Sequence, residues 1–164
     1  MILDLRPTAT EDLDFVLTTE QERENSLFVQ QWTPQQHADA LCDRDLSHLI
    51  IECITPKLTV GYIILAGLEN PHHSIELRRL VIQDKGKGYG TAALRLIKNL
   101  AFEQLHAHRL WLDVKDFNSV ARRLYEKEGF VVEGILRECL KVGDRFESLV
   151  LMSMLQSEYQ ANSR

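Results

Sequence analysis

Lys85-Gly86-Lys87-Gly88-Tyr89-Gly90-Thr91 decides the fold of this chain, because it places three glycines at alternate positions between a strand-like and a helical segment. Residues 74–82 before it are mostly apolar, and residues 88–105 after it carry apolar residues at helical spacing. Without side chains at the glycines, successive backbone N–H groups can converge on one anion, and the new helix adds its positive end. The loop therefore predicts a pyrophosphate site, and a plain tight turn is the alternative.

Two common nucleotide-binding motifs do not match this loop. A Walker A loop ends in Gly-Lys-Ser/Thr, which is missing here, and the dinucleotide pattern G-x-G-x-x-G fails because the third glycine comes one residue early. An acidic pair for magnesium is also missing. A kinase is therefore disfavoured.

A second motif lies downstream, where Asn118-Ser119-Val120-Ala121-Arg122-Arg123-Leu124-Tyr125 is followed by Gly129-Phe130. Asn118 is a good helix N-cap, and Ala121 and Tyr125 follow at spacings that place them on one helix face. Taken alone, the motif is explained by capping and packing.

Together, the two motifs resemble the acetyl-CoA signature of the GNAT superfamily, [Arg/Gln]-x-x-Gly-x-Gly/Ala followed by Asn-x-x-Ala-x-x-x-Tyr. Lys85 stands where Arg or Gln is usual, which keeps the charge but changes the side-chain contact. Within the superfamily the chain is similar to the branch of ribosomal-protein N-terminal and spermidine acetyltransferases, on residues 124–159.

The resemblance implies an α/β (or α+β) fold with a mixed, mostly antiparallel sheet of about seven strands and helices on both faces. Its central strands, residues 74–82 and 109–114, are expected to splay apart. The element order from the sequence is β-α-α-β-β-β-α-β-α-β-β. We expect one domain over residues 1–164, with a cofactor-binding core at about residues 74–155.

Local signals place two helix starts in the N-terminal third. Thr8-Ala9-Thr10-Glu11 has the spacing of a capping box, and Thr33-Pro34-Gln35-Gln36 puts proline at the first helical position. The segment from Glu20 to Trp32 is expected to be helix plus loop. Its Phe28 and Trp32 form either one wall of the acceptor site or part of the core.

The resemblance also implies roles for individual residues. Tyr125 would protonate the departing thiolate, and a phenol with a pKa near ~10 can do so at neutral pH. Glu76 is the leading general base, with Asp113 and Glu24 as weaker candidates. An ion pair of Glu76 with Arg78, or a water chain in place of a base, remains an alternative. The cofactor-binding residues would be Leu80, Val81, Ile82, Lys85, Gly86, Lys87, Gly88, Tyr89, Gly90, Thr91 and Asn118.

The implied activity is transfer of an acetyl group from acetyl-CoA to a primary amine by direct attack in a ternary complex. The acceptor is a small molecule or a peptide or protein N-terminus; polyamines, aminoglycosides and free amino acids all fit. An inactive acetyl-CoA-binding sensor is the alternative, and the presence of Tyr125 and Glu76 argues against it.

Composition limits the partners. The chain has 164 residues, 45% of them hydrophobic, and a net charge of -5, which fits one soluble cytoplasmic domain with no nucleic-acid or membrane partner. The histidines His72, His73, His106 and His108 have no accompanying ligand set, so no metal is expected. The cysteines Cys42, Cys53 and Cys139 are expected to be buried apolar residues rather than disulfides. The resemblance also suggests a homodimer.

Overall fold

The computed structural model describes residues 2–162, which form one seven-stranded sheet with the order β1-β2-β3-β4-β5-β7-β6. Within this part of the chain all neighbouring strands are antiparallel except β4 and β5. The mixed seven-stranded sheet expected from the sequence is confirmed. The strands are β1 (Leu3–Pro7), β2 (Leu46–Cys53), β3 (Leu58–Ala66), β4 (Ser74–Ile82), β5 (Arg109–Lys115), β6 (Val131–Val142) and β7 (Arg145–Leu155).

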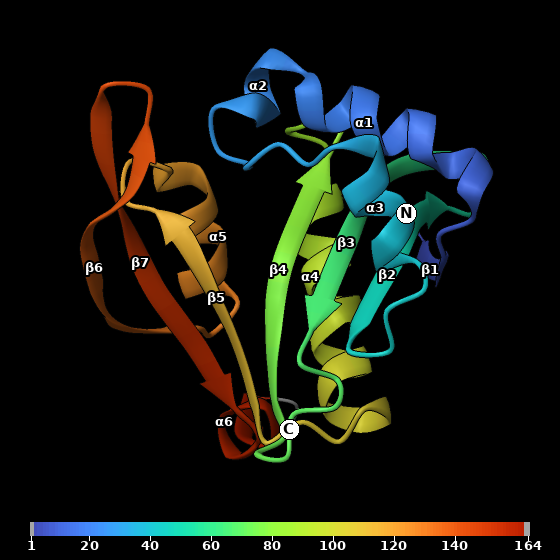
Figure 1. The fold of residues 1–164 in the computed structure, drawn as a ribbon. Coiled ribbons are helices and arrows are strands. Elements are labelled where there is room, and N and C mark those ends of the chain that lie inside the picture. Colours follow the sequence, from blue (N-terminus) through green and yellow to red (C-terminus); the bar gives the residue numbers. More distant parts are fainter. Residues whose placement is uncertain (1, 163–164) are drawn as a thin grey trace.

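Helices cover both faces of this sheet, as expected (Figure 1). One face carries α1, α2 and α3, and the other carries α4 and α5. The helices are α1 (Leu13–Gln21), α2 (Arg23–Ser26), α3 (Pro34–Ala40), α4 (Tyr89–Asn99), α5 (Ser119–Lys127) and α6 (Gln156–Asn162), with a 3-10 turn at Thr10–Asp12 and a π-helical turn at Leu100–Gln104.

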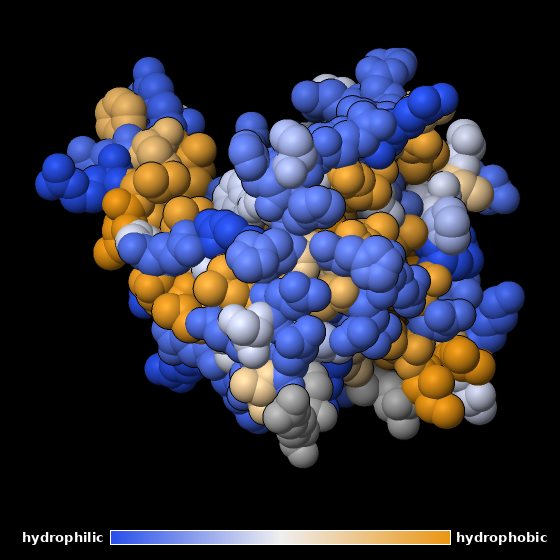
Figure 2. Space-filling view, turned by 90° about the horizontal axis from the view of Figure 1, so that it is seen from below, coloured by the Kyte–Doolittle hydropathy of each residue, from blue (hydrophilic) through white to orange (hydrophobic). Residues whose placement is uncertain are grey.

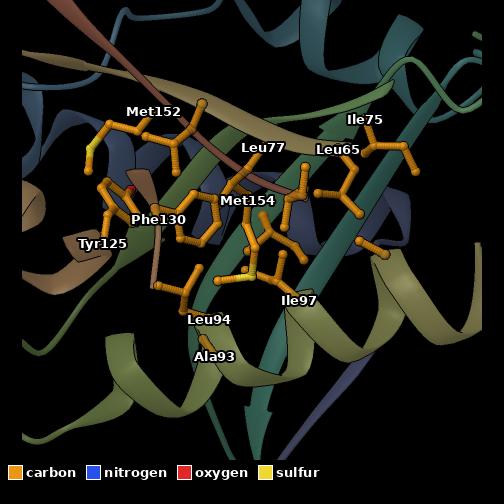
Figure 3. Close-up of a cluster of buried hydrophobic side chains, with 14 of the residues drawn as sticks. Leu65, Ile75, Leu77, Ala93, Leu94, Ile97, Tyr125, Phe130, Met152 and Met154 are labelled. Atoms are coloured by element: carbon orange, nitrogen blue, oxygen red, sulfur yellow. The ribbon is translucent and has the colours of Figure 1, made fainter. Parts of the chain in front are cut away.

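The main core lies between α4 and the sheet (Figure 3). Ala93, Leu94 and Ile97 are fully buried, because their spacing of three and four places them on one face of α4. They pack against strand residues such as Leu65 and Met154. Each large side chain buried here stabilises the fold by about 1.5–3 kcal/mol relative to exposure. This core holds the glycine loop and the start of α4 against β4.

The two predicted helix starts have different outcomes. Thr33 Oγ1 accepts from Gln36 N at 3.2 Å, and Gln36 Oε1 accepts from Thr33 N at 2.8 Å, so this capping box is confirmed. The box at Thr8 is wrong. Ala9 N donates to Asp12 Oδ2 at 2.8 Å, while Thr8 Oγ1 lies 2.9 Å from His48 Nδ1 in the interior. A tertiary partner has replaced the local cap.

Two other expectations need correction. Cys53 is buried as predicted, but Cys42 and Cys139 are exposed, because Cys42 lies in a turn and Cys139 on the outermost strand. The helix α6 was not foreseen. Its Glu158 Oε2 accepts from Leu155 N at 2.8 Å, which favours a helix directly after β7.

Candidate active site

The centre of the sheet is split between β4 and β5. These strands pair only at Ser74 with Arg109, Ile75 with Leu110 and Glu76 with Trp111, and then diverge (Figure 1). Beyond Glu76, β4 is paired on its other edge with β3, where a register shift leaves Arg78 as an extra residue. The backbone of β4 that faces the split is therefore available to a ligand, and the expected splay is confirmed.

A cleft of about 1220 Å³ fills the split. One wall comes from the N-terminal segment and β4, and the opposite wall comes from β5 and α5. The glycine loop closes one end. The lining residues are 23–25, 27–30, 32, 76–80, 82, 84–86, 88–91, 113–115, 117–121, 124, 125, 140 and 149. This volume is in the range of ligand-binding pockets or somewhat larger, and it suits a long ligand.

The glycine loop has the backbone geometry that its sequence predicts. Gly86 and Gly88 have φ of 79° and 81°, in the left-handed region that favours glycine. Gly88 is the N-cap of α4, so unpaired N–H groups of the first turn lie at the end of the cleft. A Cβ at Gly86 would meet nothing within 4 Å, which leaves space beside the backbone. The loop can hold an anion through its backbone.

Most of the predicted cofactor-binding residues line the cleft, but Val81 and Lys87 do not. Val81 is 1% exposed and packs on the opposite face of β4 with Val16 and Tyr62. Lys87 Nζ donates to Asp84 Oδ2 at 2.8 Å. Lys85 lines the cleft, and its Nζ donates to Glu24 O at 2.6 Å, which ties the loop to α2.

Asn118 and Tyr125 project from α5 into the cleft. Asn118 Oδ1 accepts from Ala121 N at 3.2 Å, so its capping role is confirmed. Tyr125 packs against Phe130 with ring centroids 5.8 Å apart. Burial, and then the negative charge of Asp113, raises the pKa of Tyr125 to about 12. The phenol is therefore protonated at neutral pH and can donate a proton.

Two carboxylates lie beside the base of the split. Glu76 Oε2 accepts from Arg78 Nη2 at 2.8 Å and from Arg78 Nε at 3.1 Å, so the ion pair considered from the sequence is present. Burial, and then the charge of Glu76, raises the pKa of Asp113. Both carboxylates line the cleft and are close enough for their charges to interact. They can attract a cation. Glu24, the third candidate, lies near the glycine loop instead.

The other end of the cleft is aromatic. Arg79 lies over the Trp32 ring at 4.8 Å, and the rings of Phe28 and Phe117 are 5.8 Å apart. Lys115 Nζ donates to Leu27 O at 2.8 Å, so β5 touches the N-terminal segment across the cleft. Trp32 and Phe28 thus both line the cleft, and Trp32 also packs against the buried cluster that contains Val16 and Tyr62. Phe117 and Lys115 were missed, because no local pattern relates them to residues 27–32.

Behind the aromatic end lies a buried polar cluster that the sequence did not reveal. It consists of Glu20, His37, His48 and Tyr62, all less than 10% exposed. His37 Nε2 lies 2.6 Å from Glu20 Oε2. Acidic and histidine residues at sequence separations of 17 and 11 give no recognisable motif, so only the structure brings them together.

Residues 2–162 contain no group of three or more His, Cys, Asp and Glu side chains arranged to hold a metal ion. Over the same range, every helix is too short or too polar to cross a bilayer.

Comparison with known proteins gives consistent results. The family model described as an acetyltransferase (GNAT) domain matches residues 3–131. The spermidine N(1)-acetyltransferase of Escherichia coli is 27% identical over 171 residues, covering 98% of this chain and 89% of the relative. A putative ribosomal N-acetyltransferase of Bacillus subtilis is 32% identical over 101 residues, covering 61% of this chain and 55% of the relative.

Solved structures from Vibrio cholerae are similar over nearly the whole chain. The spermidine N-acetyltransferase in complex with CoA and spermine has a TM-score of 0.85 at 25% identity, covering 96% of this chain and 98% of that one. A dodecameric structure of spermidine N-acetyltransferase has a TM-score of 0.83 at 25% identity, covering 99% and 98%.

Proposed function

This chain belongs to the GNAT acetyltransferase family and is an acetyl-CoA-dependent N-acetyltransferase, and we propose that its acceptor is a primary amine of a polyamine. The observation that carries the proposal is the pair of carboxylates, Glu76 and Asp113, in the cleft beside the split. A protonated amine is attracted to such a pair. The similarity to spermidine acetyltransferases over nearly the full chain supports the same acceptor class.

Acetyl-CoA fits the cleft along the exposed edge of β4. The pantetheine amides would pair with the backbone of Leu80 and Ile82, and the pyrophosphate would lie on the nest formed by residues 85–91. Asn118 would hydrogen-bond the pantetheine arm. The left-handed glycines and the open space at Gly86 support this placement. Val81 would make no direct contact with the cofactor, because its side chain is buried and its backbone is paired with β3, and Lys87 would contribute through its charge.

Several proton transfers accompany the reaction. The ammonium group first loses a proton to solvent, and the neutral amine bonds to the acetyl carbon. The nitrogen then gives a second proton to Glu76 as the carbon–sulfur bond breaks, and Glu76 returns this proton to solvent. Tyr125 gives its proton to the sulfur and regains one from solvent. The high pKa of Tyr125 does not prevent this, because the same burial also makes a thiolate formed beside it more basic. Asp113 would hold the ammonium group before it loses its proton.

Calorimetric titration with acetyl-CoA, with ATP and NAD as controls, tests the cofactor without knowledge of the amine. We expect selective binding of acetyl-CoA. Acetylation of spermidine and spermine is then followed by release of the free thiol. Selective binding without turnover of spermidine or spermine would overturn the proposed acceptor, and an absence of binding would overturn the proposed placement of acetyl-CoA in the cleft.

A peptide N-terminus is the second candidate acceptor. The similarity to a putative ribosomal N-acetyltransferase favours it, and so do the cations in the acceptor end. Arg79 lines the cleft over the Trp32 ring, and Lys115 lies nearby in its pair with Glu147; their charges could attract peptide carbonyl or carboxylate oxygens. A peptide with a free α-amine therefore belongs in the same assay. Faster turnover of the peptide than of spermidine would select this candidate.

We also propose that the protein forms a homo-oligomer through β6. The exposed apolar residues on β6 and at the start of β7 support this: Val131, Val132, Ile135, Leu136, Val142 and Phe146. Figure 2 shows orange atoms gathered on the side of the molecule where β6 and β7 lie. A large exposed apolar patch of this kind marks interaction surfaces. The homodimer expected from the sequence is one form of such an assembly, and the dodecameric relative is another.

A further inference from the structure

Four buried polar side chains form a continuous hydrogen-bonded chain beneath α1 and α3. Glu20 is 1% exposed, and His37 and Tyr62 are 0% exposed. Glu20 Oε2 lies 2.6 Å from His37 Nε2 and accepts from Tyr62 Oη at 3.2 Å. His37 Nδ1 lies 3.2 Å from His48 Nε2. The chain ends at Thr8, whose Oγ1 lies 2.9 Å from His48 Nδ1.

One arrangement of protons satisfies every contact in this chain. Thr8 donates to His48, His48 donates to His37, and His37 donates to the charged Glu20, so each imidazole is neutral with one donor and one acceptor nitrogen. Burial lowers the pKa of His48 to about 4, which agrees with a neutral ring at this position. Each of these three contacts thus has one donor and one acceptor, and every donor points toward Glu20.

Glu20 also holds in place the segment, residues 30–32, that forms part of the aromatic end of the cleft. Glu20 Oε1 accepts from the backbone N–H of Trp32 at 2.9 Å, and the backbone oxygen of Glu20 accepts from Gln31 Nε2 at 2.8 Å. Trp32 lies between His37, with centroids 5.2 Å apart, and Arg79, 4.8 Å away. Arg79 Nη2 donates to Gln30 O at 2.8 Å. Gln30, Trp32 and Arg79 all line the cleft.

Stability alone does not explain a charge at this position. Burial of a carboxylate costs free energy even when the carboxylate is hydrogen-bonded, so the geometry of Glu20 is the more informative property. Residues 30–33 have neither helical nor strand structure, and their place is set by contacts with other elements. Glu20 supplies two of these contacts.

We propose that Glu20, held by His37, is a positioning residue of the acceptor site. It fixes the backbone at Trp32 and, through the Trp32 ring, the guanidinium of Arg79, and it thereby sets the affinity for the acceptor. The inference rests on the proposed function, because it assigns residues 30–32 and Arg79 to the acceptor wall. It assigns Glu20 no contact with the reacting atoms.

Glu20→Met tests this, because Met has a similar volume but no carboxylate. We expect KM for the amine to rise about tenfold, kcat to change less than about threefold, and acetyl-CoA affinity to stay unchanged. Glu20→Gln should largely restore KM, since its amide oxygen can still accept from Trp32 and the histidine chain can reverse its direction. An unchanged KM in Glu20→Met, or a parallel loss of acetyl-CoA affinity, would overturn the proposal.

Two further variants separate positioning from general stability. Glu128→Met removes another buried carboxylate, paired with Lys98 at 2.9 Å outside the cleft, and should lower stability without changing KM for the amine.

Gln31→Ala changes an exposed side chain and leaves the core intact, so it covers the case in which Glu20→Met does not fold. We expect it to raise KM about twofold to threefold. A KM equal to the wild-type value there would argue against positioning.

Hydrogen exchange of the Trp32 amide needs no acceptor, so it remains informative if the proposed function fails. Exchange at Trp32 should be at least about tenfold faster in Glu20→Met and unchanged in Glu128→Met. Equal exchange in the wild type and Glu20→Met would overturn the positioning role. Absence of turnover in the wild type would instead count against the acceptor class.

Discussion

At the scale of single residues, burial gives ordinary side chains the properties that the reaction needs. Tyr125 is 9% exposed, and its pKa of about 12 keeps it protonated. Glu76 is held by Arg78, whereas the pKa of Asp113 is raised beside it. Two carboxylates in one cleft thus differ in their environments, which is how acid and base roles become separated.

Tyr125→Phe tests the proton donor. We expect turnover to fall about 10- to 100-fold, because the leaving sulfur loses its proton source, while acetyl-CoA affinity stays within about twofold. Because the pKa of Tyr125 is about 12, wild-type turnover should not decline through loss of this proton up to about pH 10. Steady-state kinetics and calorimetry measure both effects. Wild-type turnover in the variant would remove Tyr125 from the mechanism.

Glu76→Gln and Asp113→Asn distinguish the two carboxylates. If Glu76 accepts the proton, Glu76→Gln should lower kcat by about 10- to 100-fold, and Asp113→Asn should mainly raise KM for the amine. The measurement is the kcat and KM of each variant over a range of pH. The reverse pattern would assign the base to Asp113, and a small effect in both would favour a water chain.

At the scale of elements, the glycine loop and α4 form one anion-binding unit. The two left-handed glycines turn the chain from β4 into α4, and the buried face of α4 fixes the helix against the sheet. The positive end of the helix therefore faces the end of the cleft. If backbone groups supply most of the binding energy for a pyrophosphate here, as we propose, Lys85 can stand in place of the usual Arg or Gln.

Gly88→Val tests this unit. Valine at φ 81° is strained and puts a side chain into the nest, so we expect acetyl-CoA affinity to fall at least about 100-fold and stability to fall by about 1–3 kcal/mol. Gly143→Ala is the control, since it also has positive φ, at 60°, in open space in the β6–β7 turn. Gly143→Ala should lower the stability of the fold without lowering the affinity for acetyl-CoA. Calorimetry and thermal unfolding measure both.

The buried cluster beneath α1 and α3 makes stability depend on pH. His48 has a native pKa of about 4, below the ordinary 6.5, so the unfolded chain binds more protons between these values. The contribution of neutral His48 to the free energy of unfolding is full above pH 6.5 and is lost as the pH falls toward 4. The groups that face His48 are His37, Glu20, Arg79 and Asp12.

We therefore expect the free energy of unfolding to fall by about 3 kcal/mol between pH 6.5 and 4 on account of His48. Denaturant unfolding of the wild type and His48→Gln over this range measures it. The variant should be less stable at pH 7 but less dependent on pH. Equal slopes in the two proteins would contradict a neutral His48.

At the scale of the whole molecule, the split sheet divides the chain into two halves that meet at the base of β4 and β5. The N-terminal half supplies the wall that we propose for the acceptor, and the C-terminal half supplies β5, α5 and the β6–β7 hairpin. Leu140 and Leu149 of this hairpin also line the cleft. An interface formed by β6 would thus lie close to the cleft.

Ile135→Lys tests association through β6. Ile135 is 59% exposed, and a charge there should oppose burial in an interface. We expect light scattering to give a mass near that of the 18.9 kDa chain for this variant and a multiple of it for the wild type. Ile54→Lys, at a residue 50% exposed near the other edge of the sheet, is the control and should keep the wild-type mass. A monomeric wild type would exclude the oligomer.

Much of the cofactor half could be read from local patterns. The glycine loop, the N-cap at Asn118 and the apolar face of α4 depend on residues within a few positions of one another, so sequence spacing is enough to predict them. The splay of β4 from β5 came from the resemblance, since apolar strand residues alone do not show where pairing stops.

The acceptor half depended on contacts between distant residues. Glu20 meets Tyr62 across 42 positions, and Lys115 meets Leu27 across 88. Thr8 had a good local capping pattern, but His48 offered it a buried partner 40 positions away. Side-chain hydrogen bonds of this kind exist only after the sheet has assembled, because burial and strand register bring the partners together. The local sequence therefore identified the chemistry of the cofactor, and the packing of α1–α3 on the sheet set the wall of the cleft that we propose for the amine.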